Sequence, residues 1–118
     1  MNTLNLFKNA DNVEEYPAGA TIFEQGQPGR VMYVVLEGEV EIRAHGQAVN
    51  KLGPGDLLGE MALIDSGPRS ASAMALSRCR LAPVDEKRFL FMVQQSPFFA
   101  VHVMRELAHK LRFMTDKA

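Results

Sequence analysis

The sequence predicts an α+β fold with a short N-terminal helix, a β-sandwich or barrel of which a jelly roll is one version, and two C-terminal helices. Residues 13–84 hold short segments of alternating hydrophobicity, separated by Gly and Pro, as expected for antiparallel strands. After Val84 the apolar residues recur every three or four positions, which is typical of helices. A length of 118 residues predicts one domain with a substantial core.

The first elements are short. Residues 3–10 place Leu4 and Phe7 on one side of a helix. Further along, Val40 and Ile42 alternate with charged residues, which predicts a strand with one buried face. The inward face of the extended segment after residue 70 is expected to consist of Ala73, Ala75, Cys79 and Leu81.

The C-terminal helices have recognisable starts. Asp85 is a predicted N-cap, and Ser96 followed by Pro97 forms a second one, because Pro is favoured at the first helical position. The expected apolar stripe of the first helix is Phe89, Leu90 and Val93. The expected stripe of the second is Phe99, Val103, Leu107, Leu111 and Met114.

Composition excludes several classes of protein. A net charge of −1 gives no basic surface for direct nucleic-acid binding. The single cysteine, Cys79, rules out a disulfide framework and is expected to be a small buried hydrophobe. No apolar run is long enough to span a membrane and no signal peptide is present, so we expect a cytoplasmic protein without membrane insertion.

The motifs of common enzymes are also missing. Gly53, Gly55 and Gly59 have the wrong spacing for a dinucleotide fingerprint, and no Ser lies in a nucleophile elbow. The three histidines are too scattered for a jelly-roll metal enzyme, which is the least favoured alternative. We therefore expect no catalysis, no metal and no cofactor.

One stretch, GEMALIDSGPRSAS at residues 59–72, contains a chemical pattern. Residues 59–63 could begin a short helix with free N–H groups, and Arg69 offers a bidentate fork to phosphate. Glu60 could accept hydrogen bonds from a ribose, while Ala71 and Ser72 keep bulk out of a pocket. Spacing alone favours the simpler alternative, an exposed Glu60–Arg69 ion pair.

The stretch resembles the phosphate-binding cassette of the cyclic nucleotide-binding domain family. That cassette stands here as Leu58-Gly59-Glu60-Met61-Ala62-Leu63, five further residues, and Arg69-Ser70-Ala71-Ser72-Ala73. A second family motif is similar to IFEQGQPGRVMYVVLEG, with Gly26, Gly29 and Gly38 in place. The resemblance extends over about residues 6–114 of the chain.

The resemblance implies one cyclic nucleotide-binding domain over residues 1–118. Its jelly-roll-like antiparallel β-barrel would span about residues 13–84. The cassette at 58–73, which includes a short helix of its own, would lie within the barrel, and C-terminal helices at 85–115 would follow it. The implied ligand is cAMP in preference to cGMP, with no further cofactor. The glycines at 26, 29 and 38 would shape turns without contacting the ligand.

Roles follow by position. Arg69 would pair with the cyclic phosphate, Glu60 would accept from the ribose 2′-hydroxyl, and Gly59 would lie near the sugar. The complete set of implied ligand-binding residues is Gly59, Glu60, Met61, Ala62, Arg69, Ser70 and Ala71. Ala73 stands where a larger residue is frequent in the family, which would widen the purine site. Ser70 is found in binders of either base and leaves that choice open.

Base and lid positions rest on weaker ground. The expected base wall consists of Val49, Leu52, Leu57 and Leu58. The expected lid on the last helix consists of Lys110, Leu111, Phe113 and Met114, whose apolar members could equally be core or dimer contacts.

The implied function is a regulatory receptor whose C-terminal helices, residues 85–114, move on ligand binding to signal to an effector that the sequence does not identify. The alternative is a protein-interaction adaptor of the same fold with an unused or altered pocket. A homodimer through the last helix is compatible with either. No DNA-reading helix-turn-helix follows in this sequence, so we expect a stand-alone receptor or an excised sensor domain.

Overall fold

The structure is a computed structural model that describes residues 3–7 and 9–117, with side chains in the last helix described through residue 112. The helices are α1 (Thr3–Leu6), α2 (Glu60–Asp65), α3 (Glu86–Gln95) and α4 (Pro97–Lys117). The strands are β1 (Glu14–Tyr16), β2 (Thr21–Phe23), β3 (Met32–Glu37), β4 (Val40–Ala44), β5 (Gln47–Leu52), β6 (Leu57–Leu58), β7 (Ser72–Ala75) and β8 (Cys79–Val84).

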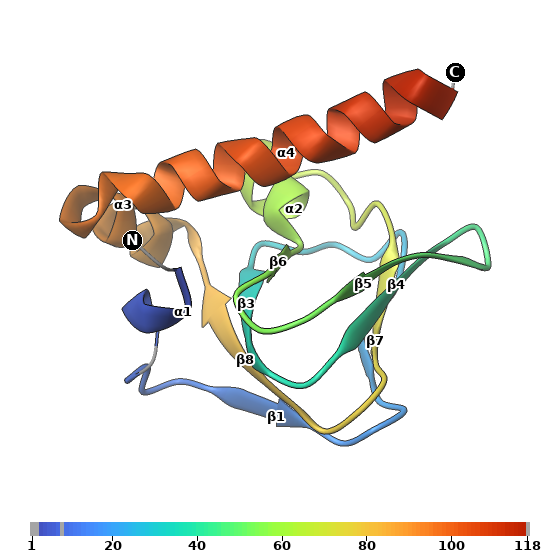
Figure 1. Cartoon of the computed structure of the whole chain (residues 1–118), viewed down its shortest axis with the longest axis horizontal. Coiled ribbons are helices and arrows are strands. Elements are labelled where there is room, and N and C mark those ends of the chain that lie inside the picture. The colour runs from blue at the N-terminus through green and yellow to red at the C-terminus, as the bar shows by residue number, and fades with distance from the viewer. Residues whose placement is uncertain (1–2, 8, 118) are drawn as a thin grey trace.

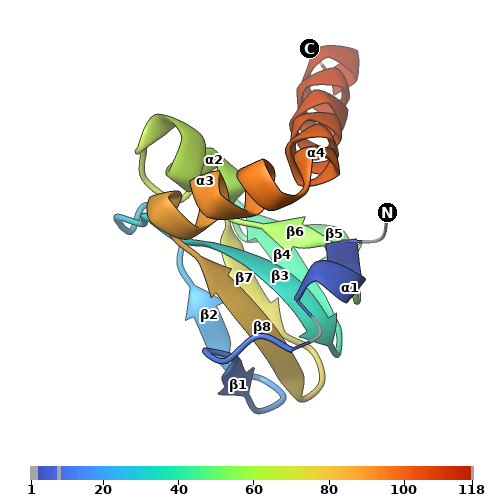
Figure 2. The same cartoon turned by 90° about the vertical axis from the view of Figure 1, so that its left-hand side faces the viewer.

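Within the described ranges, the eight strands form two four-stranded antiparallel sheets, in the orders β1-β8-β3-β6 and β2-β7-β4-β5. The predicted α+β, jelly-roll-like fold is confirmed, although the two sheets do not close into one hydrogen-bonded barrel. Helices α2, α3 and α4 gather at one end of the sheets, and α1 lies beside that end (Figures 1 and 2). The candidate cassette therefore lies where strands and helices meet.

The core consists of two clusters divided by the alternation of the strands. Val34 and Leu57 belong to the cluster that also contains Phe7 and Phe99 from the helices. Their neighbours Val35 and Leu58 belong to a second cluster, between the sheets. Successive side chains of a strand point to opposite faces, so one short strand contributes to both clusters. The predicted inward residues Ala73, Ala75, Cys79 and Leu81 are all buried in the second cluster.

The helix starts agree with the sequence, while the buried faces differ in part. Asp85 caps α3 by accepting a hydrogen bond from the Arg88 N–H at 2.8 Å, and α4 begins at Pro97. The N-terminal helix is shorter than predicted and ends at Leu6. The prediction for Leu90 is wrong, because its side chain is exposed and Met92 occupies the buried face instead.

Helix α4 has an inner and an outer half. Phe99 and Val103 are buried, and Leu107 packs against the same cluster. Leu111, one further repeat along the predicted stripe, is 65% exposed. Toward its C-terminus α4 points away from the sheets (Figure 2). No described helix is both long and apolar enough to cross a membrane.

Candidate ligand-binding site

The cassette begins with a sharp turn at Gly59, between β6 and α2. Gly59 has a φ of 78°, in the left-handed region that glycine adopts at little cost. The turn directs Glu60 inward, and this first residue of α2 is 0% exposed. A fully buried carboxylate is unusual and requires partners.

Arg69 is held in place by the turn that follows β2. Its N–H donates to the Gln27 carbonyl at 2.8 Å, and its own carbonyl accepts from the Gly26 N–H at 2.8 Å. The side chain is only 7% exposed. The glycine-containing motif and the cassette, which are separate in the sequence, therefore meet at Arg69.

Gly29 has a role beyond shaping that turn. A Cβ at this position would overlap the Arg69 guanidinium, so glycine is needed for the close approach. The Arg69 guanidinium carbon lies 4.2 Å from the centroid of the Phe23 ring, and Nη1 donates to the Gly59 carbonyl at 3.4 Å. In the described part of the chain no carboxylate pairs with Arg69.

The pKa of Arg69 is lowered from its usual value because burial disfavours the charged form, and the nearby Tyr33 hydroxyl acts weakly in the opposite direction. An arginine remains protonated at physiological pH even so. The site therefore contains a desolvated cation that no carboxylate among the described residues neutralises.

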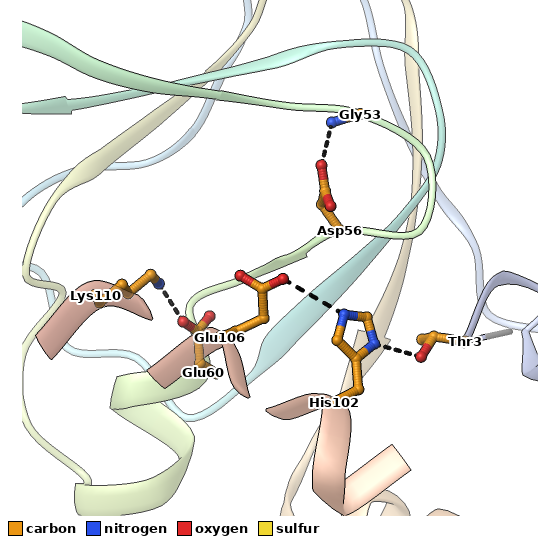
Figure 3. A network of polar contacts seen from close by, with 7 residues as sticks. All are labelled: Thr3, Gly53, Asp56, Glu60, His102, Glu106 and Lys110. Carbon is orange, nitrogen blue, oxygen red and sulfur yellow. Dashed lines mark hydrogen bonds and ion pairs between the residues drawn. The ribbon is translucent and has the colours of Figure 1, made fainter. Parts of the chain in front are cut away.

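Glu60 is paired with a residue far away in the sequence. Its Oε1 accepts from Lys110 Nζ on α4, whereas its Oε2 is buried and has no hydrogen-bond partner among the described residues (Figure 3). The exposed Glu60–Arg69 ion pair favoured by spacing alone is wrong, because both side chains are buried and each contacts other groups.

Lys110 belongs to a polar row on α4 with His102 and Glu106, each four residues apart (Figure 3). His102 Nδ1 contacts the Thr3 hydroxyl on α1, and His102 Nε2 lies 3.5 Å from a Glu106 carboxylate oxygen. Side chains four apart lie on the same face of a helix. The row thus ties α4 to α1 near one end and to α2 near the other.

A small cavity of about 40 Å³ lies between the cassette, β2, β4 and α4. Six of the seven predicted ligand-binding residues line it: Gly59, Met61, Ala62, Arg69, Ser70 and Ala71. Glu60 does not line the cavity itself but contacts Lys110, which does. The cassette residues that the sequence singled out are therefore brought together.

The base-wall positions are only partly brought to the cavity. Leu58 lines it, whereas Val49 is exposed on β5 and Leu52 packs against the core between the sheets. Leu57 faces the helix-side core, because it alternates with Leu58. On the lid side Lys110 lines the cavity, Leu111 does not, and Phe113 and Met114 lie outside the described side chains.

Two residues that line the cavity, Phe23 and Ile42, were not among the predicted ligand-binding residues. The alternation of Val40 and Ile42 with charged residues predicted a buried face for this strand, but it could not show that Ile42, which pairs with Ala73 across β4 and β7, borders the cavity. Phe23 lies within the quoted glycine motif, but the three residues of β2 are too few to show which face is buried. Within the described residues, no group of three or more potential metal ligands is present.

Comparisons with known proteins show which family the chain resembles. The family model described as "Cyclic nucleotide-binding domain" matches residues 13–96. The cyclic AMP receptor protein of Thermus thermophilus is 40% identical over 102 residues, which cover 82% of this chain and 47% of that protein. The chain spans about half the length of the curated relatives that it matches.

Solved structures of related proteins have a similar fold. The crystal structure of the Thermus thermophilus catabolite activator protein superimposes with a TM-score of 0.80 at 34% identity, covering 95% of this chain and 60% of that one. A structure from work on a cyclic-GMP-dependent signalling pathway in bacterial phytopathogenesis has a TM-score of 0.77 at 28% identity, covering 92% of this chain and 89% of that one.

Proposed function

The chain belongs to the cyclic nucleotide-binding domain family, and we propose that its cassette cavity binds a cyclic mononucleotide, cAMP in preference to cGMP. We further propose that it acts as a regulatory receptor that signals through its C-terminal helices and catalyses no reaction.

The observation that carries this proposal is a buried acceptor and a buried cation that lie close to one cavity. Among the described residues, Glu60 Oε2 has no hydrogen-bond donor and the Arg69 guanidinium has no anionic partner. Leaving either group unpaired away from water costs free energy, which a suitable ligand would recover. A cyclic nucleotide offers both complements, because its phosphate is anionic and its ribose carries a 2′-hydroxyl donor.

The remaining cassette residues support the same assignment. Met61, Ala62 and Ser70 line the cavity beside Arg69, where their polar groups would complete the anion cradle. The Ser70 hydroxyl lies 3.9 Å from the Met61 sulfur, which makes a weak contact that a phosphate or a base could readily replace. Leu58 and Ile42 supply apolar wall for the base.

The small size of the cavity supports the proposal that the helices transmit the signal. Pockets for ligands of this kind usually measure about 300–1,000 Å³, whereas this one measures about 40 Å³. Lys110 forms part of its wall, so nucleotide entry requires Lys110 and the outer half of α4 to move. Differential affinity for the two positions of α4 would then couple ligand binding to an effector.

The exposed side of α4 also offers a surface for a second copy of the chain. Met104 and Leu111 are exposed and lie seven residues apart, which is the repeat of a two-helix seam. We propose a homodimer along this seam, which sedimentation analysis of the chain at several concentrations would detect. If α4 serves as a docking surface while the cavity binds no nucleotide, the chain is an adaptor of the same fold.

Titration calorimetry of the purified chain with cAMP and cGMP tests the proposed ligand. Linear 5′-AMP serves as the control, because it carries a similar base and sugar without the ring phosphate. We expect saturable binding of cAMP, weaker binding of cGMP and weaker binding still of 5′-AMP. Absence of binding of both cyclic nucleotides at high micromolar concentration would contradict the proposal.

A further inference from the structure

We infer that Phe23 is a positioning residue for anion recognition: its ring supports the face of the Arg69 guanidinium and leaves the edge available for phosphate. The inference rests on the proposed function, because it concerns the same cavity. It assigns a role to a residue outside the cassette, at the end of β2.

The first support is geometric. The Arg69 guanidinium carbon lies 4.2 Å from the Phe23 centroid, well within the distance of about 6 Å at which a cation interacts with an aromatic face. Both side chains are buried, so water does not screen the interaction strongly. The Arg69 guanidinium also donates from Nη1 to the Gly59 carbonyl, but this hydrogen bond is long, at 3.4 Å.

The second support is that the ring itself is fixed. Phe23 stacks on Tyr33 with centroids 6.3 Å apart and planes inclined by 22°. Tyr33 lies on β3 and pairs in register with Leu58, the residue before the Gly59 turn. Arg69, Phe23 and Tyr33 therefore connect the cassette to both sheets through one set of stacked groups.

The chemistry of arginine explains why a face-on support suits an anion site. All five N–H donors of a guanidinium lie in its plane and point outward from its edge. A carboxylate partner would occupy these donors and compete with phosphate, whereas an aromatic ring stabilises the cation through its face. Phe23 can therefore compensate part of the burial of Arg69 without blocking its fork.

Replacement of the ring tests this role. Phe23→Leu keeps an apolar side chain but removes the aromatic face, and we expect cAMP affinity to fall roughly tenfold. Phe23→Tyr keeps the ring and should bind nearly as well as the parent chain. Phe91→Leu is the matched control, because Phe91 is 56% exposed and does not line the cavity.

Two comparisons separate positioning from simple core packing. Adenosine lacks the phosphate, so its affinity should be unchanged by Phe23→Leu if Phe23 acts through Arg69. In an Arg69→Ala background, Phe23→Leu should cause no additional loss of cAMP affinity. An equal loss for both ligands, or the same loss in the Arg69→Ala background, would overturn the inference.

A measurement without nucleotide distinguishes failure of this inference from failure of the proposed function. In the parent chain, NMR should show the Arg69 Nε–H proton shifted by the ring current of Phe23. We expect the shift to be lost in Phe23→Leu and in Phe23→Met, the second variant in case the first fails to fold, and kept in Phe23→Tyr. An unchanged shift without the ring rejects the role of Phe23, whereas a parent chain that shows the shift but binds neither cyclic nucleotide rejects only the proposed function.

Discussion

Arg69 and Glu60, the two buried charges of the cassette, are held by different parts of the molecule. Arg69 is fixed by β2 and the turn that follows it, through backbone hydrogen bonds to the turn and through the Phe23 ring. Glu60 is held by an ion pair with Lys110 from α4. The first set of contacts lies in β2 and the turn that follows it, whereas the second reaches a helix whose residues 108–112 are exposed.

The difference indicates a division of labour within one small site. The half that would receive the phosphate is preorganised, because its supports belong to strands and a tight turn. The half that would receive the sugar is linked to α4, the helix whose movement is part of the proposed function. Preorganised contacts supply affinity, while contacts to a movable element supply coupling.

The largest expected effect on cAMP affinity comes from removing the Arg69 side chain, on the side of the site held by the sheets. Arg69→Ala removes the bidentate cation and should weaken cAMP binding by about 2–4 kcal/mol. Calorimetry would measure the loss, with Arg78→Ala as the control, because Arg78 forms only an exposed ion pair with Glu15. An unchanged affinity would show that the phosphate does not meet Arg69.

Removing the charge of Glu60, which α4 holds through Lys110, should have the next largest effect on cAMP affinity. Glu60→Gln keeps the shape of the side chain but weakens its bond to a ribose hydroxyl, which should cost about 1.5–3 kcal/mol of binding free energy. The loss should be small for 2′-deoxy-cAMP, because that ligand lacks the donor. Glu24→Gln, at an exposed position, controls for net charge. A similar loss with both ligands would contradict the sugar contact.

A single methyl group added at Gly29 should displace the Arg69 guanidinium. Gly29→Ala places a Cβ where the Arg69 guanidinium lies, so the fork must shift, and we expect cAMP binding to weaken by about 1–2 kcal/mol. Gly53→Ala is the matched control, because its added Cβ would meet no atom within 4 Å. Equal behaviour of the two variants in calorimetry would argue against the close approach.

The smallest expected effect is an increase in cAMP affinity, in contrast to the losses above. Lys110→Met removes an ion pair that must yield when nucleotide enters, so we expect cAMP binding to strengthen by about 0.5–1 kcal/mol. The Lys110 side chain is 44% exposed, which limits the gain. Amide exchange in α4 should become faster in this variant and remain unchanged in Lys110→Arg. Weaker binding by Lys110→Met would mean that the ion pair supports the ligand instead of closing the cavity.

The two halves of the site, around Arg69 and around Glu60, could not be predicted equally well from the sequence. Gly59 and Arg69 could be identified because a local motif fixes their types and spacing, and the structure brings them to one cavity. The ion pair between Glu60 and Lys110 joins residues 50 positions apart, and no local pattern specifies such a pair. The helical repeat predicted the inner half of α4 well, but it could not show that the buried stripe stops before Leu111.

The base wall was harder to predict for a related reason. Leu57 and Leu58 form a two-residue strand, and two consecutive leucines show no alternation from which a face could be assigned. Tertiary packing decides that Leu57 joins the helices and Leu58 the cavity. Phe23 is similar, because its importance comes from Arg69 and Tyr33, which lie far from it in the chain.

The bridge between the turn after β2 and the cassette has a consequence for the lifetime of the folded chain. Beside the backbone pair at Arg69, the Gln25 N–H donates to the Ser72 hydroxyl at 2.8 Å across 47 residues of sequence. Closing a loop of that length has an entropic cost on the order of 3 kcal/mol, so the cavity comes into existence only once distant segments have joined. A ligand that binds only the joined form adds its own free energy to the native state. Nucleotide concentration would then set how long the chain resists unfolding and proteolysis, in addition to any signal that α4 transmits.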